Sequence, residues 1–255
     1  MPRVLFVHGA AGDARVWQPV IDALGSEFDA RAVTLTYFGT GNWPDSGENF
    51  GTELHAADIE RAASGGGVHL VSWSMGTQPA LKALCDAPHL FASALFYEPG
   101  LATFVEDETE RAAWAADAHA AFAAVAQALH ESGERAAVDA MIGERLADLS
   151  EERRQIYRDN ARTMPLLMGG GRPPAEITAA ELASVDCPTR IAMGASARPC
   201  FAIPSRGLAG ALPSSELVIV ESADHFLPEV DPARFATLVR DWLSRTGVNW
   251  RQSGS

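Results

Sequence analysis

One serine of the chain stands where a buried strand gives way to a helix. The apolar run from Val68 to Trp73 predicts a short strand, and the spacing of apolar residues from Met75 to Cys85 predicts a helix. Ser74 therefore lies on the turn between them, beside the free backbone N–H groups of a helix N-terminus, which attract negative charge. A serine held there is suited to attack an acyl carbonyl. Its alternative role is to cap the helix.

Two histidines stand in comparable positions at the ends of strands. An apolar strand from Val4 to Val7 runs directly into His8-Gly9, and a strand from Leu217 to Val220 is followed by a loop that ends in His225. A serine nucleophile needs a neighbouring general base, most often a histidine. His225 is either that base or an ordinary loop histidine, and its place after the last predicted strand favours the base.

The order strand–His-Gly–loop, strand–Ser–helix and strand–loop–His resembles the α/β-hydrolase superfamily over nearly the whole chain. The resemblance implies that Ser74 is the nucleophile and His225 the general base. It also implies that the backbone N–H groups of Ala10 and Met75 form the oxyanion hole, which binds the negative oxygen of the reaction intermediate.

A histidine base needs a carboxylate that fixes its tautomer and stabilises the imidazolium. Most relatives place this acid after the strand that here ends at Gly194, yet no Asp or Glu occurs from Cys187 to Ser215. Asp224 is adjacent to His225, and neighbouring side chains in a loop rarely reach each other's ring. Elimination leaves Glu98, at the end of the strand that follows the nucleophile's strand. By resemblance, zearalenone-type lactonases and certain haloalkane dehalogenases carry the acid there. The alternative for Glu98 is a solvated turn residue.

Strands and helices alternate along most of the chain, which predicts a parallel, doubly wound α/β sheet. Counting the apolar runs gives about six strands, with the first beginning at Arg3. Many hydrolases of this type have a hairpin before that strand, so we expect a sheet trimmed at its N-terminal side. Residues 1–100 and 181–255 are predicted to form this hydrolase core.

Residues 101–180 interrupt the alternation with an Ala-rich helical stretch, and the resemblance implies a helical cap over the site. One apolar stripe of this stretch consists of Trp114, Ala118, Phe122, Val125 and Leu129, and a second consists of Val138, Met141, Ile142, Arg145, Leu146 and Leu149. We expect most of these residues to be core between cap helices and a minority to face the pocket. The residues predicted to contact substrate are Trp73, Phe38, Trp114 and Met164, although the aromatic residues of the Phe38 loop could instead pack that loop down.

Composition excludes several classes of function. The net charge of −13 argues against binding to nucleic acid. No apolar run approaches the roughly 20 residues of a membrane helix, and no leader pattern opens the chain, so a cytoplasmic protein is expected. The 3 cysteines form no C-x-x-C pair and the 7 histidines do not cluster, so we expect no metal. We expect no cofactor either, and a single lysine, Lys82, leaves almost no candidate for Schiff-base chemistry.

The residues favour a serine hydrolase that cleaves a carboxylic ester or lactone of a small, fairly apolar molecule through an acyl-enzyme. A serine at position 74 argues against the dehalogenase and epoxide-hydrolase chemistries of this fold, which need a carboxylate nucleophile. Two alternatives remain open: a lyase or carbon–carbon bond hydrolase on the same triad, and a ligand receptor with little or no turnover. The unusual acid position and Ser72, where the family has glycine, leave the receptor open. The sequence does not indicate an oligomeric state.

Overall fold

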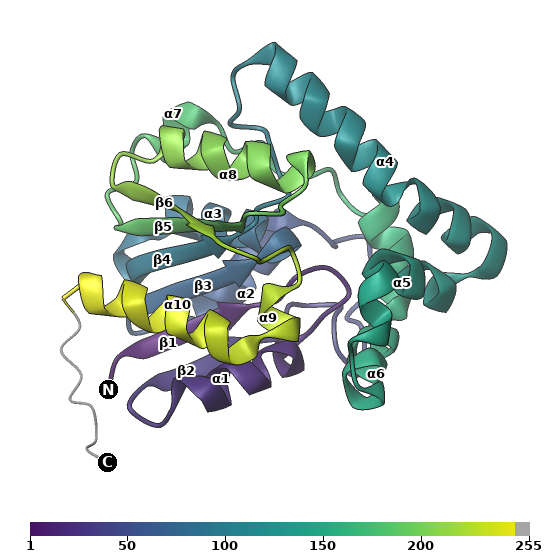
Figure 1. Ribbon diagram of the computed structural model, residues 1–255, viewed down its shortest axis with the longest axis horizontal. Helices are drawn as coiled ribbons and strands as arrows, with labels where there is room; N and C mark the ends of the chain where they lie inside the picture. Colours follow the sequence, from purple (N-terminus) through teal and green to yellow (C-terminus); the bar gives the residue numbers. More distant parts are fainter. Residues whose placement is uncertain (248–255) are drawn as a thin grey trace.

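A sheet of six parallel strands runs through residues 1–247, the part of the chain that the computed structural model describes (Figure 1). The strands are β1 Arg3–Val7, β2 Asp29–Val33, β3 Val68–Trp73, β4 Phe91–Tyr97, β5 Thr189–Gly194 and β6 Ser215–Val220. Their order across the sheet is β2-β1-β3-β4-β5-β6. The chain therefore winds from β1 to one edge and then, from β3, to the other. This confirms the predicted doubly wound parallel α/β fold.

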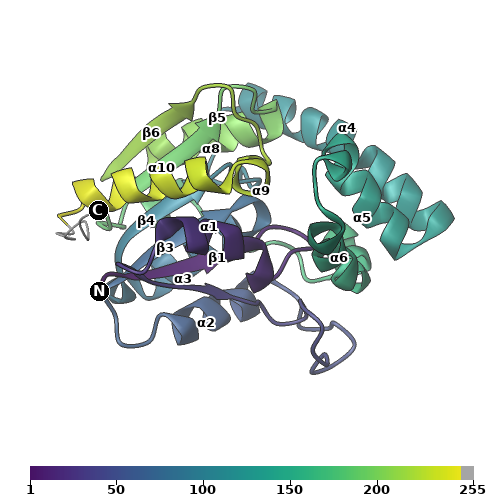
Figure 2. The ribbon, with the colours of Figure 1, turned by 60° about the horizontal axis from the view of Figure 1, so that its bottom comes forward.

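Helices cover both faces of the sheet (Figures 1 and 2). One face is covered by α1 Gln18–Leu24 and α10 Pro232–Arg245, and the other by α2 Thr52–Ala62, α3 Thr77–Asp86 and α8 Pro199–Ala211. Successive residues of a strand point to opposite faces. Phe6 therefore packs in the same hydrophobic cluster as Trp17, and Val7 in the same cluster as Ile59. Burial on both sides explains the apolar runs of the central strands, whereas the edge strands β2 and β6 are only partly buried.

Short elements join the main strands and helices. A separate 3-10 turn, Ala14–Trp17, precedes α1, and Pro19 lies in the first turn of α1, where its lack of an N–H breaks no helical hydrogen bond. The remaining short elements are α7 Ala179–Leu182, α9 Leu227–Val230, the 3-10 turns Ser74–Gly76, Pro88–Leu90, Gly143–Ala147 and Ala161–Thr163, and the π turn Leu166–Gly170.

The inserted residues 101–180, which we call the cap segment, lie at the end of the sheet where the strands terminate (Figure 1). Their main helices are α4 Glu108–Ser132, α5 Glu134–Ile142 and α6 Glu151–Asp159. Val125 is the single buried residue of α4, and Phe122 is 38% exposed. The stripe of α4 thus lies mostly outside the core, contrary to expectation, whereas Val138, Ile142 and Leu149 of the second stripe are buried in the core as expected. The helix packs against α5 and α8 and leaves much of its length uncovered.

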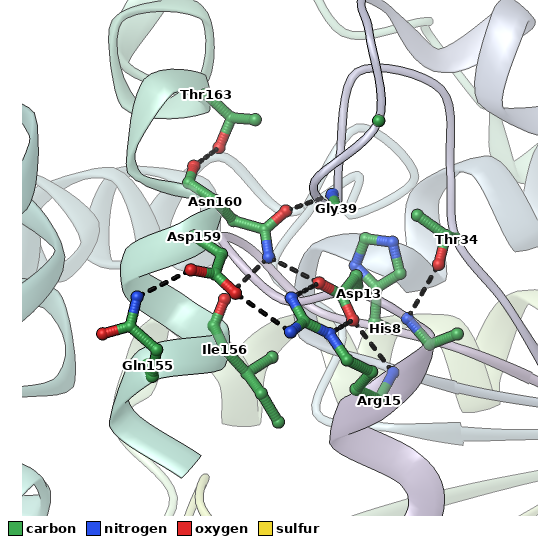
Figure 3. Close-up of polar contacts among 12 residues, drawn as sticks. His8, Asp13, Arg15, Thr34, Gly39, Gln155, Ile156, Asp159, Asn160 and Thr163 are labelled. Atoms are coloured by element: carbon green, nitrogen blue, oxygen red, sulfur yellow. Dashed lines mark hydrogen bonds and ion pairs between the residues drawn. The ribbon is translucent and has the colours of Figure 1, made fainter. Parts of the chain in front are cut away.

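The α6 end of the cap segment is fastened to the core by a buried polar network (Figure 3). Asn160 is fully buried, its Nδ2 donates to Asp13 Oδ2 at 2.8 Å, and its Oδ1 accepts from the Gly39 backbone at 2.5 Å. Arg15 donates to Asp159 at 2.9 Å and also pairs with Asp13. Hydrogen bonds between buried polar groups are costly to break, because the group left behind has no water to bind. The cap segment is thus fixed at α6.

Candidate active site

The turn between β3 and α3 holds Ser74 in a conformation that few residues adopt. Its φ is 57°, in the left-handed region, which costs a residue with a Cβ about 1–3 kcal/mol. The neighbours must be small. A Cβ on Gly76 would lie 2.2 Å from the carbonyl oxygen of His8, and a Cβ on Gly9 would lie 3.2 Å from the Cβ of Ser74. The strand–Ser–Gly pattern therefore reflects a tight turn at the carboxyl end of β3.

Ser72, which stands where the family has glycine, is accommodated inside the fold. Its side chain is fully buried, and its hydroxyl donates to Thr77 Oγ1 at 3.1 Å. Burying this hydroxyl costs little, because its hydrogen bond to Thr77 replaces the one that it would make with water. The contact also ties the end of β3 to the first turn of α3, so the replacement supports the turn that carries Ser74.

Ser74, His225 and Glu98 form a continuous chain of polar contacts. Ser74 Oγ lies 3.0 Å from His225 Nε2, and Nδ1 of the same ring lies 2.8 Å from Glu98 Oε2. An ionised carboxylate can only accept hydrogen bonds. With Glu98 ionised, the ring proton sits on Nδ1, and Nε2 is left to accept the proton of the Ser74 hydroxyl.

Glu98 is held inside the sheet and is not solvated. The residue is 0% exposed, and its second oxygen, Oε1, accepts from the Gly194 backbone at 2.8 Å. Its own N–H donates to Ala192 O at 3.0 Å, and its φ of 48° turns the chain sharply after β4. The backbone at the end of β5, where most relatives place the acid, thus binds the carboxylate of Glu98. Buried charges require such partners.

Asp224, the alternative carboxylate, is turned away from the histidine ring. Its Oδ1 accepts from the Phe226 backbone at 2.9 Å, and its Oδ2 accepts from the guanidinium of Arg145 in the cap segment. Its carbonyl oxygen accepts from the Tyr97 hydroxyl at 2.7 Å. Burial raises the pKa of Tyr97, so this hydroxyl stays a donor. Asp224 therefore anchors the loop that carries His225.

Two aromatic side chains hold the ring of His225 in place. Phe201 stacks on it with a centroid distance of 3.7 Å and an interplanar angle of 9°, and Trp73 lies 5.5 Å away. Phe201 was not among the predicted site residues. The sequence signal was its position in the first turn of α8, the helix that follows the strand ending at Gly194. Arg145 was also missed, and no sequence pattern pairs it with Asp224.

The His8-Gly9 segment is rigidly held beside Ser74. Nδ1 of His8 donates to Gly9 O at 2.8 Å, and Nε2 accepts from the Leu35 backbone at 3.2 Å. Burial lowers the pKa of His8 to about 4, so the ring is neutral near pH 7. Because the N–H and C=O groups of a trans peptide point in opposite directions, this contact turns the Ala10 N–H away from His8. Both Ala10 and Met75 line a cavity together with Ser74.

Three of the four predicted contact residues lie around this site. Trp73 lines a cavity of about 750 Å³ together with Ser74 and His225, and Trp114 and Met164 line a second cavity of about 410 Å³. Phe38 lies elsewhere. It is 5% exposed and packs against His8, Phe50 and His55 in the hydrophobic core. The aromatic residues of that loop pack it down onto α2, so the prediction that Phe38 contacts substrate is not supported by its position.

Among residues 1–247, no three or more His, Cys, Asp and Glu side chains are grouped so that they could hold a metal ion. In the same part of the chain, no helix combines the length and apolar character needed to cross a bilayer. The polar groups gathered at the ends of β3, β4 and β6 are the candidate for chemistry because of their mutual contacts.

A parallel sheet with a serine on a strained strand-to-helix turn and a histidine after the last strand defines a class of proteins. The chain belongs to the alpha/beta hydrolase family, whose profile matches residues 4–238. The esterase Rv0045c of Mycobacterium tuberculosis is 34% identical over 92 residues, which cover 35% of this chain and 30% of that esterase. The match thus spans less than a third of the relative's length.

Solved structures share the fold over almost the full chain. The esterase RhEst1 from Rhodococcus sp. ECU1013 superposes with a TM-score of 0.74 at 17% identity, over 96% of this chain and 91% of that one. A thermophilic esterase from Thermogutta terrifontis gives a TM-score of 0.72 at 20% identity, over 97% and 91% of the two chains. At such low identity the likeness shows the fold alone.

Proposed function

We propose that the protein is a serine hydrolase that cleaves a carboxylic ester or lactone of a small molecule through an acyl-enzyme. The observation that carries the proposal is the unbroken contact chain from Ser74 Oγ through the His225 ring to Glu98. The esterase of Mycobacterium tuberculosis supports an ester as the cleaved bond. Its matched stretch is 34% identical to this chain, compared with 17% and 20% for the two esterases of known structure. Ser74 has no carboxylate of its own, which agrees with acyl transfer over displacement at a saturated carbon.

The reaction begins when His225 Nε2 takes the proton of the Ser74 hydroxyl as Oγ attacks the carbonyl carbon. The carbonyl oxygen becomes negative and is bound by the N–H groups of Ala10 and Met75. Removing one such donor typically costs on the order of 100-fold or more in rate. Protonated His225 then gives its proton to the leaving oxygen, and the acyl-enzyme remains.

Water completes the cycle by the same steps in reverse order. His225 accepts a proton from the water that attacks the acyl carbon, and then returns a proton to Ser74 Oγ. Glu98 stays ionised throughout and keeps the ring proton on Nδ1, because the buried contact stabilises the imidazolium formed at each step. For a lactone the leaving alcohol stays attached to the acyl group, and the chemistry is otherwise unchanged.

The cap segment, residues 101–180, acts in this proposal as the part that covers the site. Its support is its position at the carboxyl ends of the strands and the contribution of α4 and α5 to the cavity walls. Covering the site excludes water and strengthens the electrostatic contacts beneath it. The core of residues 1–100 and 181–255 supplies the reacting groups.

The test is labelling with a fluorophosphonate, which forms a bond between phosphorus and an activated serine oxygen as fluoride leaves. Intact mass should show one label on the parent protein and none on Ser74→Ala. Ser72→Ala is the matched control, because its hydroxyl is buried against Thr77, and this variant should still be labelled. Ester cleavage should be lost only in Ser74→Ala.

Absence of label on a folded parent protein would contradict the proposal and favour the receptor. A Ser74→Ala variant that keeps most of the parent activity would show that Ser74 is not the nucleophile. Circular dichroism and thermal melting of each variant would establish that the fold is unchanged.

A further inference from the structure

Ser74 opens onto two cavities that differ in chemistry. Both are lined by Ser74, Ala10, Phe122, Met141 and Phe201. We infer that the preferred substrate joins an apolar acyl chain, which enters the smaller cavity, to a polar and uncharged alcohol, which enters the larger one. The inference rests on the proposed function and names the substrate class of the same site.

The smaller cavity, about 410 Å³, has an uncharged and largely apolar wall. Its distinctive lining consists of Leu101, Trp114, Ala118, Met164, Leu167 and Met168. Gln78 adds one amide, and within residues 1–247 its Nε2 has no hydrogen-bond partner. Methionine side chains adapt their shape to flexible apolar groups. Such a wall stabilises an alkyl chain, since each buried methylene contributes about 0.8 kcal/mol.

The larger cavity, about 750 Å³, is lined by charged as well as apolar side chains, and its two arginines are already paired. Arg145 contacts Asp148 at 2.9 Å and also pairs with Asp224. Arg198 contacts Asp117 at 2.8 Å. Glu144 adds a further negative charge to the lining. Because the described lining offers no arginine without a carboxylate partner, it suits a neutral group that forms hydrogen bonds better than an anion.

The position of His225 decides which part of the ester enters which cavity. The leaving oxygen must receive a proton from Nε2, so the alcohol lies on the side of the ring. His225 lines the larger cavity and, in the described residues, not the smaller one. Met75, whose N–H is proposed to bind the oxyanion, lines the smaller cavity. The acyl chain therefore extends past Ser74 into the apolar side.

One helix contributes a separate small residue to each cavity. On α4, Ala118 lines the smaller cavity and Ala121 lines the larger. Ala120 is exposed between them and lines neither among the described residues. Phenylalanine at any of these positions keeps the helix, since its propensity differs from that of alanine by less than about 0.7 kcal/mol. The three positions form a matched set.

The first experiment uses two isomeric esters of opposite orientation. 1-Glyceryl hexanoate has an apolar acyl group and a polar alcohol, and hexyl glycerate has the reverse. After division by the rate of alkaline hydrolysis, kcat/KM should be about tenfold or more higher for glyceryl hexanoate. Equal or reversed values would overturn the inference. So would cleavage of neither ester by a protein that a fluorophosphonate labels at Ser74. Absence of that label would remove the proposed function itself.

The second experiment locates each half of the substrate. Ala118→Phe should lower the hexanoate-to-acetate ratio of kcat/KM for glyceryl esters by about tenfold. Ala121→Phe should instead lower the glyceryl-to-methyl ratio for hexanoate esters. Ala120→Phe should leave both ratios unchanged. If Ala118→Phe changed the alcohol ratio or neither ratio, the acyl chain would not occupy the smaller cavity.

Discussion

Two parts of the molecule around the site are built in different ways. One is the set of loops that carry Ser74, Glu98 and His225, and the other is the helix α4, which helps to enclose them. Glu98 is 0% exposed, and both Ser74 and Glu98 hold positive φ angles that surrounding contacts must maintain. In α4, by contrast, a single residue of 25 is buried, and Phe122 stands 38% exposed beside the cavity. The proposed reacting groups are fixed by the core, whereas substitutions in the facing wall should cost little stability. Substitutions in the loops should thus affect turnover or stability, and those in α4 the choice of substrate.

The largest effect is expected at Glu98. Glu98→Gln keeps the shape of the side chain, but its amide can donate to Nδ1 and so support the wrong tautomer. We expect kcat to fall about 10³- to 10⁴-fold on a good ester, with little change in KM. Asp224→Asn is the matched control and should lose far less, because its carboxylate faces Arg145. A nearly unchanged Glu98→Gln beside an inactive Asp224→Asn would reverse the assignment.

The next effect is expected at Gly76, on stability. A Cβ there would lie 2.2 Å from His8 O, so Gly76→Ala must displace backbone. We expect a loss of about 3 kcal/mol in the free energy of unfolding, measured by urea denaturation. Gly210→Ala, in α8 with nothing within 4 Å of the added Cβ, should be neutral or stabilising by up to about 1 kcal/mol. Equal losses would show that the turn is not tight.

Acid should lower the free energy of unfolding through histidines that are buried in the core. Burial lowers the pKa of His8 from 6.5 to about 4, so the unfolded chain binds more protons between these values. Stability is then complete above pH 6.5 and falls by up to about 1.4 kcal/mol per unit as the pH drops towards 4. His8→Asn, whose amide can still donate to Gly9 O, should show a shallower decline between pH 6.5 and 5. Burial also lowers the pKa of His55 and His69, so some of the slope should remain.

The control for this measurement lies on α4. His119 is exposed there, so His119→Asn removes a histidine without disturbing the core. The pH dependence of this variant is the baseline against which the curve of His8→Asn is compared. If both substitutions flattened the curve alike, the acid sensitivity would not come from burial of His8.

The smallest effect on stability is expected at Phe122. Because the side chain is 38% exposed, Phe122→Ala should cost less than about 1 kcal/mol in unfolding free energy. Phe235→Ala, at a fully buried position against Trp17 and Tyr97, should cost about 3–5 kcal/mol. Phe122 lines both cavities, so its loss should still change kcat/KM between esters. Equal destabilisation by the two substitutions would show that α4 is as well packed as the core.

Strands and turns could be predicted from the sequence because their causes are local. The apolar runs before Ser74 and Glu98 give buried strands, and the carboxyl ends of parallel strands meet at one edge of the sheet. The absence of carboxylates after Gly194 then pointed to Glu98, which the structure brings within 2.8 Å of the His225 ring. The strands depend on residue type and order alone, whereas the step to Glu98 also used the resemblance to the α/β-hydrolase superfamily, which says where the acid usually lies.

What could not be predicted depends on long-range packing. An aromatic residue in a loop can face a cavity or the core, and Phe38 turned inward because Phe50 and His55 lie against it. The helical spacing in α4 showed which residues share a face, but not that the face would border a cavity. The pairing of Arg145 with Asp224 joins residues 79 positions apart, and neither has a neighbour in sequence that signals the other.

The buried contact between Asn160 and Asp13 has a consequence for exchanging parts between relatives. Asp13 directly follows the loop from His8 to Gly12, so this hydrogen bond connects the cap segment to the proposed oxyanion-binding loop. A chimera that replaces only α4 and α5 keeps this hydrogen bond and should accept the corresponding helices of a relative. One that extends its graft past Asn160 must keep an amide at that position, because otherwise Asp13 retains Arg15 but loses its contact with the cap segment.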